Sequence, residues 1–154
     1  MQDLPDTPAR RAYLALVQVH EQLAGEASAL FRSRGLSLSQ FNALRILVNA
    51  PENGVSCQFI AENLVHRVPD VTRLVDRMER SGLVTRQRCT NDRRVVRVSI
   101  TAKGRELCES CYPDVAAMHE RHFEGMAEDK VEALDGLLRE LLALHRSEAT
   151  AVEN

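Results

Sequence analysis

Residues 55–104 contain the pattern that most limits the fold, two short helices followed by a basic hairpin. Ser56 can cap a helix from Cys57 to about Val65, because a serine side chain accepts a hydrogen bond from free backbone amides. Pro69 suits the first turn of a second helix, where its missing N–H costs nothing. This helix has an apolar face at helical spacing, formed by Val71, Leu74, Val75 and Met78. Beside it lies an arginine face, formed by Arg73, Arg77 and Arg80. One face is therefore expected to pack, and the other to carry guanidinium groups.

Two strands are predicted after Gly82, over residues 83–89 and 95–100, with Asn91 and Asp92 at the turn between them. In the second strand, Val96, Val98 and Ile100 alternate with Val95, Arg97 and Ser99, which is the period of a half-buried strand. Two helices joined by a tight turn and followed by such a hairpin form a winged helix-turn-helix. We therefore predict a mainly α fold with a small β-hairpin wing.

Longer helices are predicted on both sides of this segment. The first runs from about Pro8 to Arg34 and the last from about Glu128 to Arg146, and each carries a heptad-like apolar stripe. Between them, the capping box Ser37–Gln40 begins a further helix, and Thr101 begins one that reaches about Phe123 with a kink at Pro113.

A chain of 154 residues has the usual size of one domain. We expect residues 36–101 to form the winged helix-turn-helix lobe and residues 8–34 and 102–147 to form helical dimerisation arms. Neither apolar stripe is suited to solvent, so we expect the first and last helices to pack together and against a second copy. A two-fold homodimer follows as a prediction.

The charge of the chain is divided unevenly along its length. Residues 66–105 hold 11 Lys and Arg against 4 Asp and Glu, whereas the other residues hold 9 against 18. A basic segment on an acidic protein suits a molecule that presents one face to phosphate. A solvated charged surface is the alternative interpretation of the same charges.

These features predict which residues contact double-stranded DNA. The N-terminal end of the second helix should reach base edges in the major groove, and a wing arginine should enter the minor groove. Asp92 is expected to pair with an arginine and hold the wing tip in shape, with a solvated carboxylate as the alternative. The predicted DNA contacts are Arg67, Pro69, Asp70, Thr72, Arg73 and Arg77 around the helix and Arg93 and Arg94 on the wing.

The chain resembles the MarR family of winged helix-turn-helix regulators over nearly its whole length. Its most specific match is Asp92-x-Arg94, followed by five residues and Ile100-Thr101-x-x-Gly104. Two further matches are Gly35-Leu36-Ser37-x-x-Gln40-Phe41-x-x-Leu44 and Thr72-Arg73-Leu74-Val75-x-x-Met78-Glu79-x-x-Gly82-Leu83-Val84. The resemblance implies a homodimer on a palindromic operator, with Arg94 as the wing arginine. It also implies a repressor released by a small ligand or by thiol oxidation, although some members of the family activate transcription.

Three groups of residues are candidates for sensing. Cys108 and Cys111 share a helix face, but a mid-helix pair has poor disulfide geometry, so packing thiols are favoured over a redox switch. His119 and His122 could bind a metal only with further ligands, and surface or core histidines are the favoured interpretation. The resemblance implies a pocket for a phenolic or aromatic-carboxylate ligand between the arms and the lobe. The residues that could line this pocket are Tyr13, His20, Phe41, Arg45 and Met118.

The sequence favours no enzyme and no cofactor. It has no glycine-rich phosphate loop, no G-x-S-x-G and no H-E-x-x-H. It also has no apolar run long enough to cross a membrane and no signal peptide, so a cytoplasmic protein without a membrane partner is expected. The alternatives left open are a redox- or metal-responsive regulator of the same fold and a winged-helix module that binds an acidic protein.

Overall fold

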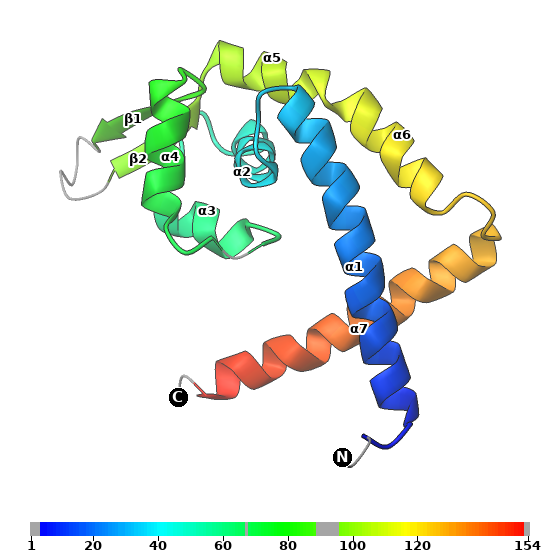
Figure 1. Cartoon of the computed structure of the whole chain (residues 1–154). Helices are drawn as coiled ribbons and strands as arrows, with labels where there is room; N and C mark the ends of the chain where they lie inside the picture. The colour runs from blue at the N-terminus through cyan, green and yellow to red at the C-terminus, as the bar shows by residue number, and fades with distance from the viewer. Residues whose placement is uncertain (1–3, 67, 89–95, 153–154) are drawn as a thin grey trace. The chain divides into compact units, whose positions relative to one another are not determined.

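The computed structural model describes residues 4–66, 68–88 and 96–152, with side chains up to residue 145. It forms two compact units, Met1–Ala116 and Ala117–Asn154. The described chain is mostly helical and has one antiparallel hairpin, as predicted (Figure 1). Its elements are α1 (Pro8–Ser33), α2 (Leu38–Val48), α3 (Cys57–Asn63), α4 (Val71–Arg80), β1 (Val84–Arg88), β2 (Val96–Ile100), α5 (Ala102–Ser110), α6 (Tyr112–His122) and α7 (Glu128–Val152).

The predicted helix starts at Ser37, Ser56 and Thr101 are confirmed. Each side chain accepts a hydrogen bond from the backbone amide three residues later, which satisfies one of the amides that a helix start leaves free. Gln40 also accepts from the Ser37 amide at 2.8 Å, completing the capping box. α1 ends before Gly35, whose φ of 72° is the left-handed conformation expected after a helix.

The start of α4 differs from the prediction. Pro69 lies before the helix, and Asp70 is the N-cap, with its Oδ1 accepting from the Arg73 amide at 2.9 Å. An aspartate can cap the helix through its side chain and proline cannot, so the helix begins one residue after Asp70.

The long helix predicted after Thr101 is interrupted rather than only kinked. α5 ends at Ser110 and α6 begins at Tyr112. Pro113 has no N–H to bond the Glu109 carbonyl, and the Cys111 amide instead bonds the Cys108 carbonyl at 3.1 Å. Asp114, in the first turn of α6, pairs with Arg34 at the end of α1.

The core of the first unit lies where α1, α2, α4, the hairpin and α5 meet. Phe31 stacks on Phe41 with 4.2 Å between ring centroids. The other large side chains buried there are Leu44, Leu47, Ile60, Leu74, Val75, Met78, Val84 and Val98. The apolar face predicted for α4 is thus confirmed for Leu74, Val75 and Met78.

The wing is anchored to the segment before α3. In the hairpin, Val84 pairs with Ile100 and Arg88 with Val96. Val55 adds a short bridge, because it exchanges backbone hydrogen bonds of 2.7 and 3.0 Å with Val98. The base of the wing therefore has a fixed position relative to α3.

The start of β1 and the end of β2 meet the start of α5 at a tight junction. The Thr101 hydroxyl lies 2.8 Å from the Gly82 carbonyl oxygen, and the Thr101 amide donates to the Leu83 carbonyl at 3.1 Å. A Cβ on Gly104 would lie 2.1 Å from the same Leu83 oxygen. Only glycine fits at position 104 without a shift of the surrounding backbone.

Two helices carry apolar side chains that the chain itself leaves exposed. On α1, Tyr13 is 66 % exposed, and on α7, Leu137 is 65 % exposed. The others are Leu14, Leu16, Val17 and Val19 on α1 and Leu141, Leu142 and Leu144 on α7. None of the described helices combines the length and apolar character needed to cross a bilayer.

We expect Gly104→Ala to lower the free energy of unfolding by about 1–3 kcal/mol, because the added methyl overpacks the junction against the Leu83 carbonyl. Gly25→Ala is the matched control, since Gly25 lies inside α1 and an added Cβ there would meet no neighbouring side chain within 4 Å. Alanine should stabilise that helix by about 0.5–1 kcal/mol. Urea unfolding measures both changes, and equal effects of the two substitutions would contradict the tight junction.

Candidate nucleic-acid interface

α4 has three distinct faces. Leu74, Val75 and Met78 are buried in the core. A second stripe, formed by Thr72, Asp76 and Glu79, lies against the hairpin strand β1. A third stripe, formed by Arg73, Arg77 and Arg80, is exposed. The helix is thus held on two sides and presents a row of three arginines on the remaining side.

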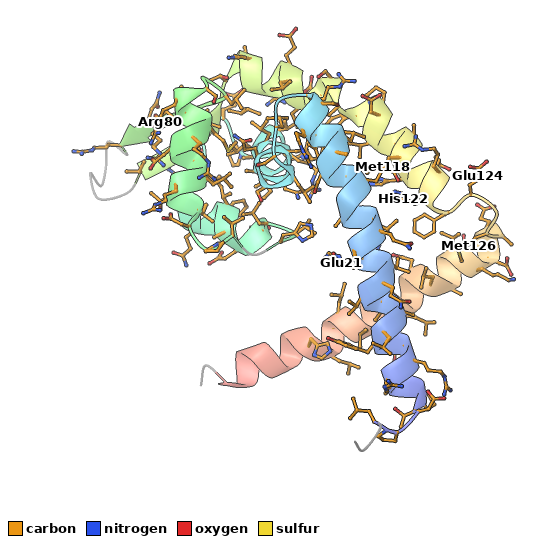
Figure 2. All side chains as sticks on the ribbon, viewed as in Figure 1. Glu21, Arg80, Met118, His122, Glu124 and Met126 are labelled. Atoms are coloured by element: carbon orange, nitrogen blue, oxygen red, sulfur yellow. The ribbon has the colours of Figure 1, made fainter. Side chains whose placement is uncertain are left out.

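The exposed stripe is available to an anionic partner. The Arg73 side chain is 80 % exposed, and its Nε lies 3.1 Å from the Asp70 carboxylate. Figure 2 shows Arg80 on the same helix, at its C-terminal end. Guanidinium groups suit this position because they bind both phosphate and the edge of guanine in paired hydrogen bonds.

The structure brings together only part of the predicted DNA-contact set. Pro69, Asp70, Thr72 and Arg73 lie at the start of α4, and Arg77 lies on its exposed face. Arg67 on the approach and Asp92, Arg93 and Arg94 at the wing tip lie outside the described residues. Their predicted contacts stay predictions.

Sequence reasoning missed the role of Arg86, which joins β1 to α4. Its Nη1 lies 2.5 Å from the Asp76 carboxylate, and its Nη2 donates to the Thr72 carbonyl at 3.0 Å. Its backbone amide donates to the Glu79 carboxylate at 3.1 Å. Arg88 shares the strand and the sheet face of Arg86, so no signal in the sequence separates the two.

The cysteines are placed as packing residues. Cys108 and Cys111 are fully buried, and Cys57 is half-buried. Burial raises the pKa of all three thiols. A raised pKa leaves less thiolate at neutral pH and so lowers reactivity. Cys89 lies outside the described residues.

The residues predicted to line a ligand pocket have different environments. Phe41 is buried on Phe31, Arg45 is exposed near the end of α2, and Tyr13 is exposed on α1. His20 lies on α1, and the centroid of its ring is 5.9 Å from the ring centroid of His66, a residue that precedes α4. Met118 is buried and belongs to the second unit.

Tyr112 is a neighbour of Phe41 and Arg45 that the sequence did not indicate. Its ring meets Phe41 edge-on at 6.5 Å, and its hydroxyl lies 3.7 Å from the Cys108 sulfur. Burial, followed by the Cys108 contact, raises the pKa of Tyr112 to about 12, and the charge of Arg45 acts in the opposite direction. Phe41, Arg45 and Tyr112, here called the Tyr112 cluster, are all in the first unit.

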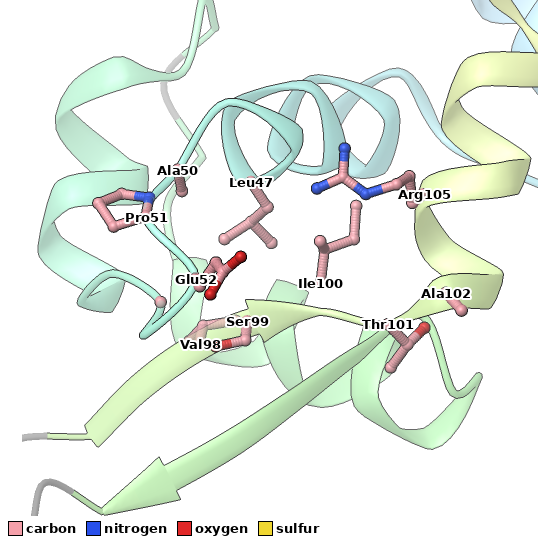
Figure 3. A pocket seen from close by; sticks show the side chains of 11 residues that line it. Leu47, Ala50, Pro51, Glu52, Val98, Ser99, Ile100, Thr101, Ala102 and Arg105 are labelled. Atoms are coloured by element: carbon pink, nitrogen blue, oxygen red, sulfur yellow. The ribbon is translucent and has the colours of Figure 1, made fainter.

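Hollows in the described part of the chain also lie away from the α4 surface, and two of them are shown here. One, of about 210 Å³, lies between the end of α2, β2 and the start of α5, with Leu47, Ile100 and Arg105 in its wall (Figure 3). The other lies at the turn from α6 to α7, where Figure 2 shows Glu124 and Met126. Across the described ranges, no three His, Cys, Asp or Glu side chains are grouped to hold a metal ion, His119 and His122 included.

Comparison with known proteins places this geometry among transcriptional regulators. A family model described as "MarR family" matches residues 36–96. The Homoprotocatechuate degradative operon repressor of Escherichia coli is 28 % identical over 138 residues, which are 87 % of this chain and 89 % of that protein. The relatives are regulators rather than enzymes, as expected from the sequence.

Solved structures similar to this chain are also MarR family regulators. A MarR transcription factor from Planctomyces limnophilus is 33 % identical, with a TM-score of 0.69 and coverage of 88 % of this chain and 98 % of that one. AbsC, a MarR family transcriptional regulator from Streptomyces coelicolor, is 24 % identical, with a TM-score of 0.80 and coverage of 96 % and 99 %. The first similarity extends to sequence, and the second concerns the fold.

We expect Asp70→Ala to lower the free energy of unfolding by about 1 kcal/mol, because the Arg73 amide loses its cap. Asp70→Asn should stay within a few tenths of a kcal/mol of the wild type, since asparagine caps as well as aspartate. Urea unfolding of the three proteins measures this. If Asn proves as costly as Ala, the ion pair with Arg73 stabilises the helix start, and the cap does not.

We expect the buried thiols to resist modification. In a Cys57→Ser/Cys89→Ser background at pH 7, a disulfide reagent should react with Cys108 and Cys111 on the order of a hundredfold more slowly than in urea, because reaction needs local opening. The released chromophore measures both rates. Fast reaction of the native protein would instead favour the redox-responsive alternative.

Proposed function

The chain belongs to the MarR family, and we propose that it binds a palindromic operator in double-stranded DNA as a homodimer in the cytoplasm. The observation that carries this proposal is the exposed arginine stripe of α4, which the core and the hairpin hold on the other two sides. A helix about 10–12 Å across fits a major groove about 12 Å wide. The stripe would then face the base edges and the flanking phosphates.

The proposed homodimer is supported by the exposed apolar residues of α1 and α7. Large contiguous apolar surfaces on a soluble chain mark interaction sites. A two-fold dimer would carry two copies of α4, and a palindrome offers two matching half-sites about one helical turn apart. Each protomer would read one half.

We further propose that the protein represses transcription and is released by a small aromatic ligand. Repression is supported by the name of the Escherichia coli relative, the repressor of a homoprotocatechuate degradative operon. The Tyr112 cluster offers such a ligand the aromatic rings of Phe41 and Tyr112 and the cationic side chain of Arg45. Such a ligand releases DNA only if it binds the free conformation more tightly than the DNA-bound one.

Fluorescence anisotropy tests the proposed DNA binding. A duplex selected from random sequence by the protein should bind at least about 10³-fold more tightly than a scrambled duplex of the same composition. The preference should persist across a salt series, although both affinities fall with salt. Equal binding to both duplexes would favour the protein-interaction alternative.

We expect Arg73→Ala to weaken binding to the selected duplex by about 1–3 kcal/mol and to relax the sequence preference at one position of each half-site, as loss of a bidentate base contact does. Arg139→Ala is the control, since Arg139 is an exposed arginine of α7 paired with Asp135. Uniform weakening across sequences, with a smaller salt slope, would show instead that Arg73 contacts phosphate.

A further inference from the structure

We propose that Arg86 is a positioning residue for DNA recognition, which fixes the rotation of α4 about its axis relative to the wing. This inference rests on the proposed reading of DNA by α4. The guanidinium and backbone of Arg86 meet three residues of one helix stripe, Thr72, Asp76 and Glu79. They are spaced i, i+4 and i+7, so the contacts extend along two turns of the helix.

The charge of Arg86 is directed inward. Its side chain is only 23 % exposed and has the Asp76 carboxylate at 2.5 Å and that of Glu79 at 3.9 Å. Its Nε is buried without a hydrogen-bond partner, which indicates that the side chain is enclosed between strand and helix. Arg86 is therefore unlike the exposed arginines of α4, because its cation is neutralised within the protein and is not presented to phosphate.

Arginine chemistry suits this position. A planar guanidinium offers several donors at fixed angles, and here Nη1 and Nη2 bind a carboxylate and a main-chain carbonyl at once. The carbonyl belongs to Thr72, directly before Arg73. The contact therefore fixes the backbone at the N-terminal end of α4, which is the end proposed to approach the bases.

A small rotation of α4 would be enough to disturb recognition. Rotating a helix by about 20° moves atoms at its outer radius of about 5–6 Å by about 2 Å. Hydrogen bonds to bases tolerate a change of only a few tenths of an ångström in the donor–acceptor distance. The core face of α4 can repack around Leu74 and Met78, whereas the three contacts of Arg86 set one rotation.

The test compares Arg86→Gln with Arg88→Gln, which removes the same charge from the same strand and sheet face. We expect Arg86→Gln to weaken binding to the selected duplex by about tenfold or more, the order expected when one base contact is lost. Its binding to scrambled duplex and its salt slope should stay those of the wild type, because no phosphate contact is removed. Arg88→Gln should leave the preference between the two duplexes unchanged.

Three further variants, Arg86→Lys, Asp76→Asn and the double variant of Asp76→Asn with Arg86→Gln, keep the test independent of folding. Arg86→Lys retains the charge but loses the paired geometry, and should lose sequence preference as Arg86→Gln does. Asp76→Asn combined with Arg86→Gln should weaken binding by less than the two single effects together, since both act through one contact. Additive effects, or a smaller salt slope for Arg86→Gln, would overturn the inference.

Hydrogen exchange of the DNA-free protein separates this inference from the proposed function. Amides of α4 should exchange faster in Arg86→Gln than in Arg88→Gln, whatever the protein binds. If the wild type prefers no duplex, the proposed function fails. If the wild type has a preferred duplex and Arg86→Gln matches it in affinity and in exchange, the positioning role fails.

Discussion

The junction at Thr101 and Gly104 is the contact on which the arrangement of the lobe depends. Thr101 ends the hairpin, caps α5 and lies within hydrogen-bond distance of the carbonyls that follow α4. Gly104 lets α5 approach the Leu83 carbonyl more closely than any side chain would allow. The end of α4, both strands and the start of α5 thus meet within a few residues. The motif Ile100-Thr101-x-x-Gly104 is informative about the fold because its residues form the junction between the hairpin and α5.

Helix starts were predictable because a cap is local chemistry. Ser37, Ser56 and Thr101 each place a hydroxyl oxygen three residues before the amide that it satisfies. The start of α4 was misplaced because two rules competed at Pro69 and Asp70, and the side chain that can accept a hydrogen bond determined the boundary. The break after Ser110 was indicated by Pro113, but its extent depends on how Cys111 and Asp114 bond to neighbouring backbone and to α1.

The candidate site was predictable only where the helical spacing of residue types distinguishes one face of α4 from another. Spacing separated the apolar face of α4 from its arginine face, and burial agrees for Leu74, Val75 and Met78. Spacing could not reveal the stripe that faces the hairpin, because Asp76 and Glu79 resemble ordinary surface acids in sequence. Their role depends on Arg86, a residue of another element. Tyr112 was missed for the same reason, since its contacts with Phe41 and Cys108 are tertiary.

One short helix, α5, connects the wing junction to the Tyr112 cluster within the first unit. α5 begins at the wing junction with Thr101 and ends beside Cys108, whose sulfur meets Tyr112. Nine helical residues span about 14 Å as a nearly rigid rod. At the start of the same helix, Gly104 packs tightly against the Leu83 carbonyl. α5 thus joins the Tyr112 cluster to the base of the wing, and Arg86 joins the wing to α4.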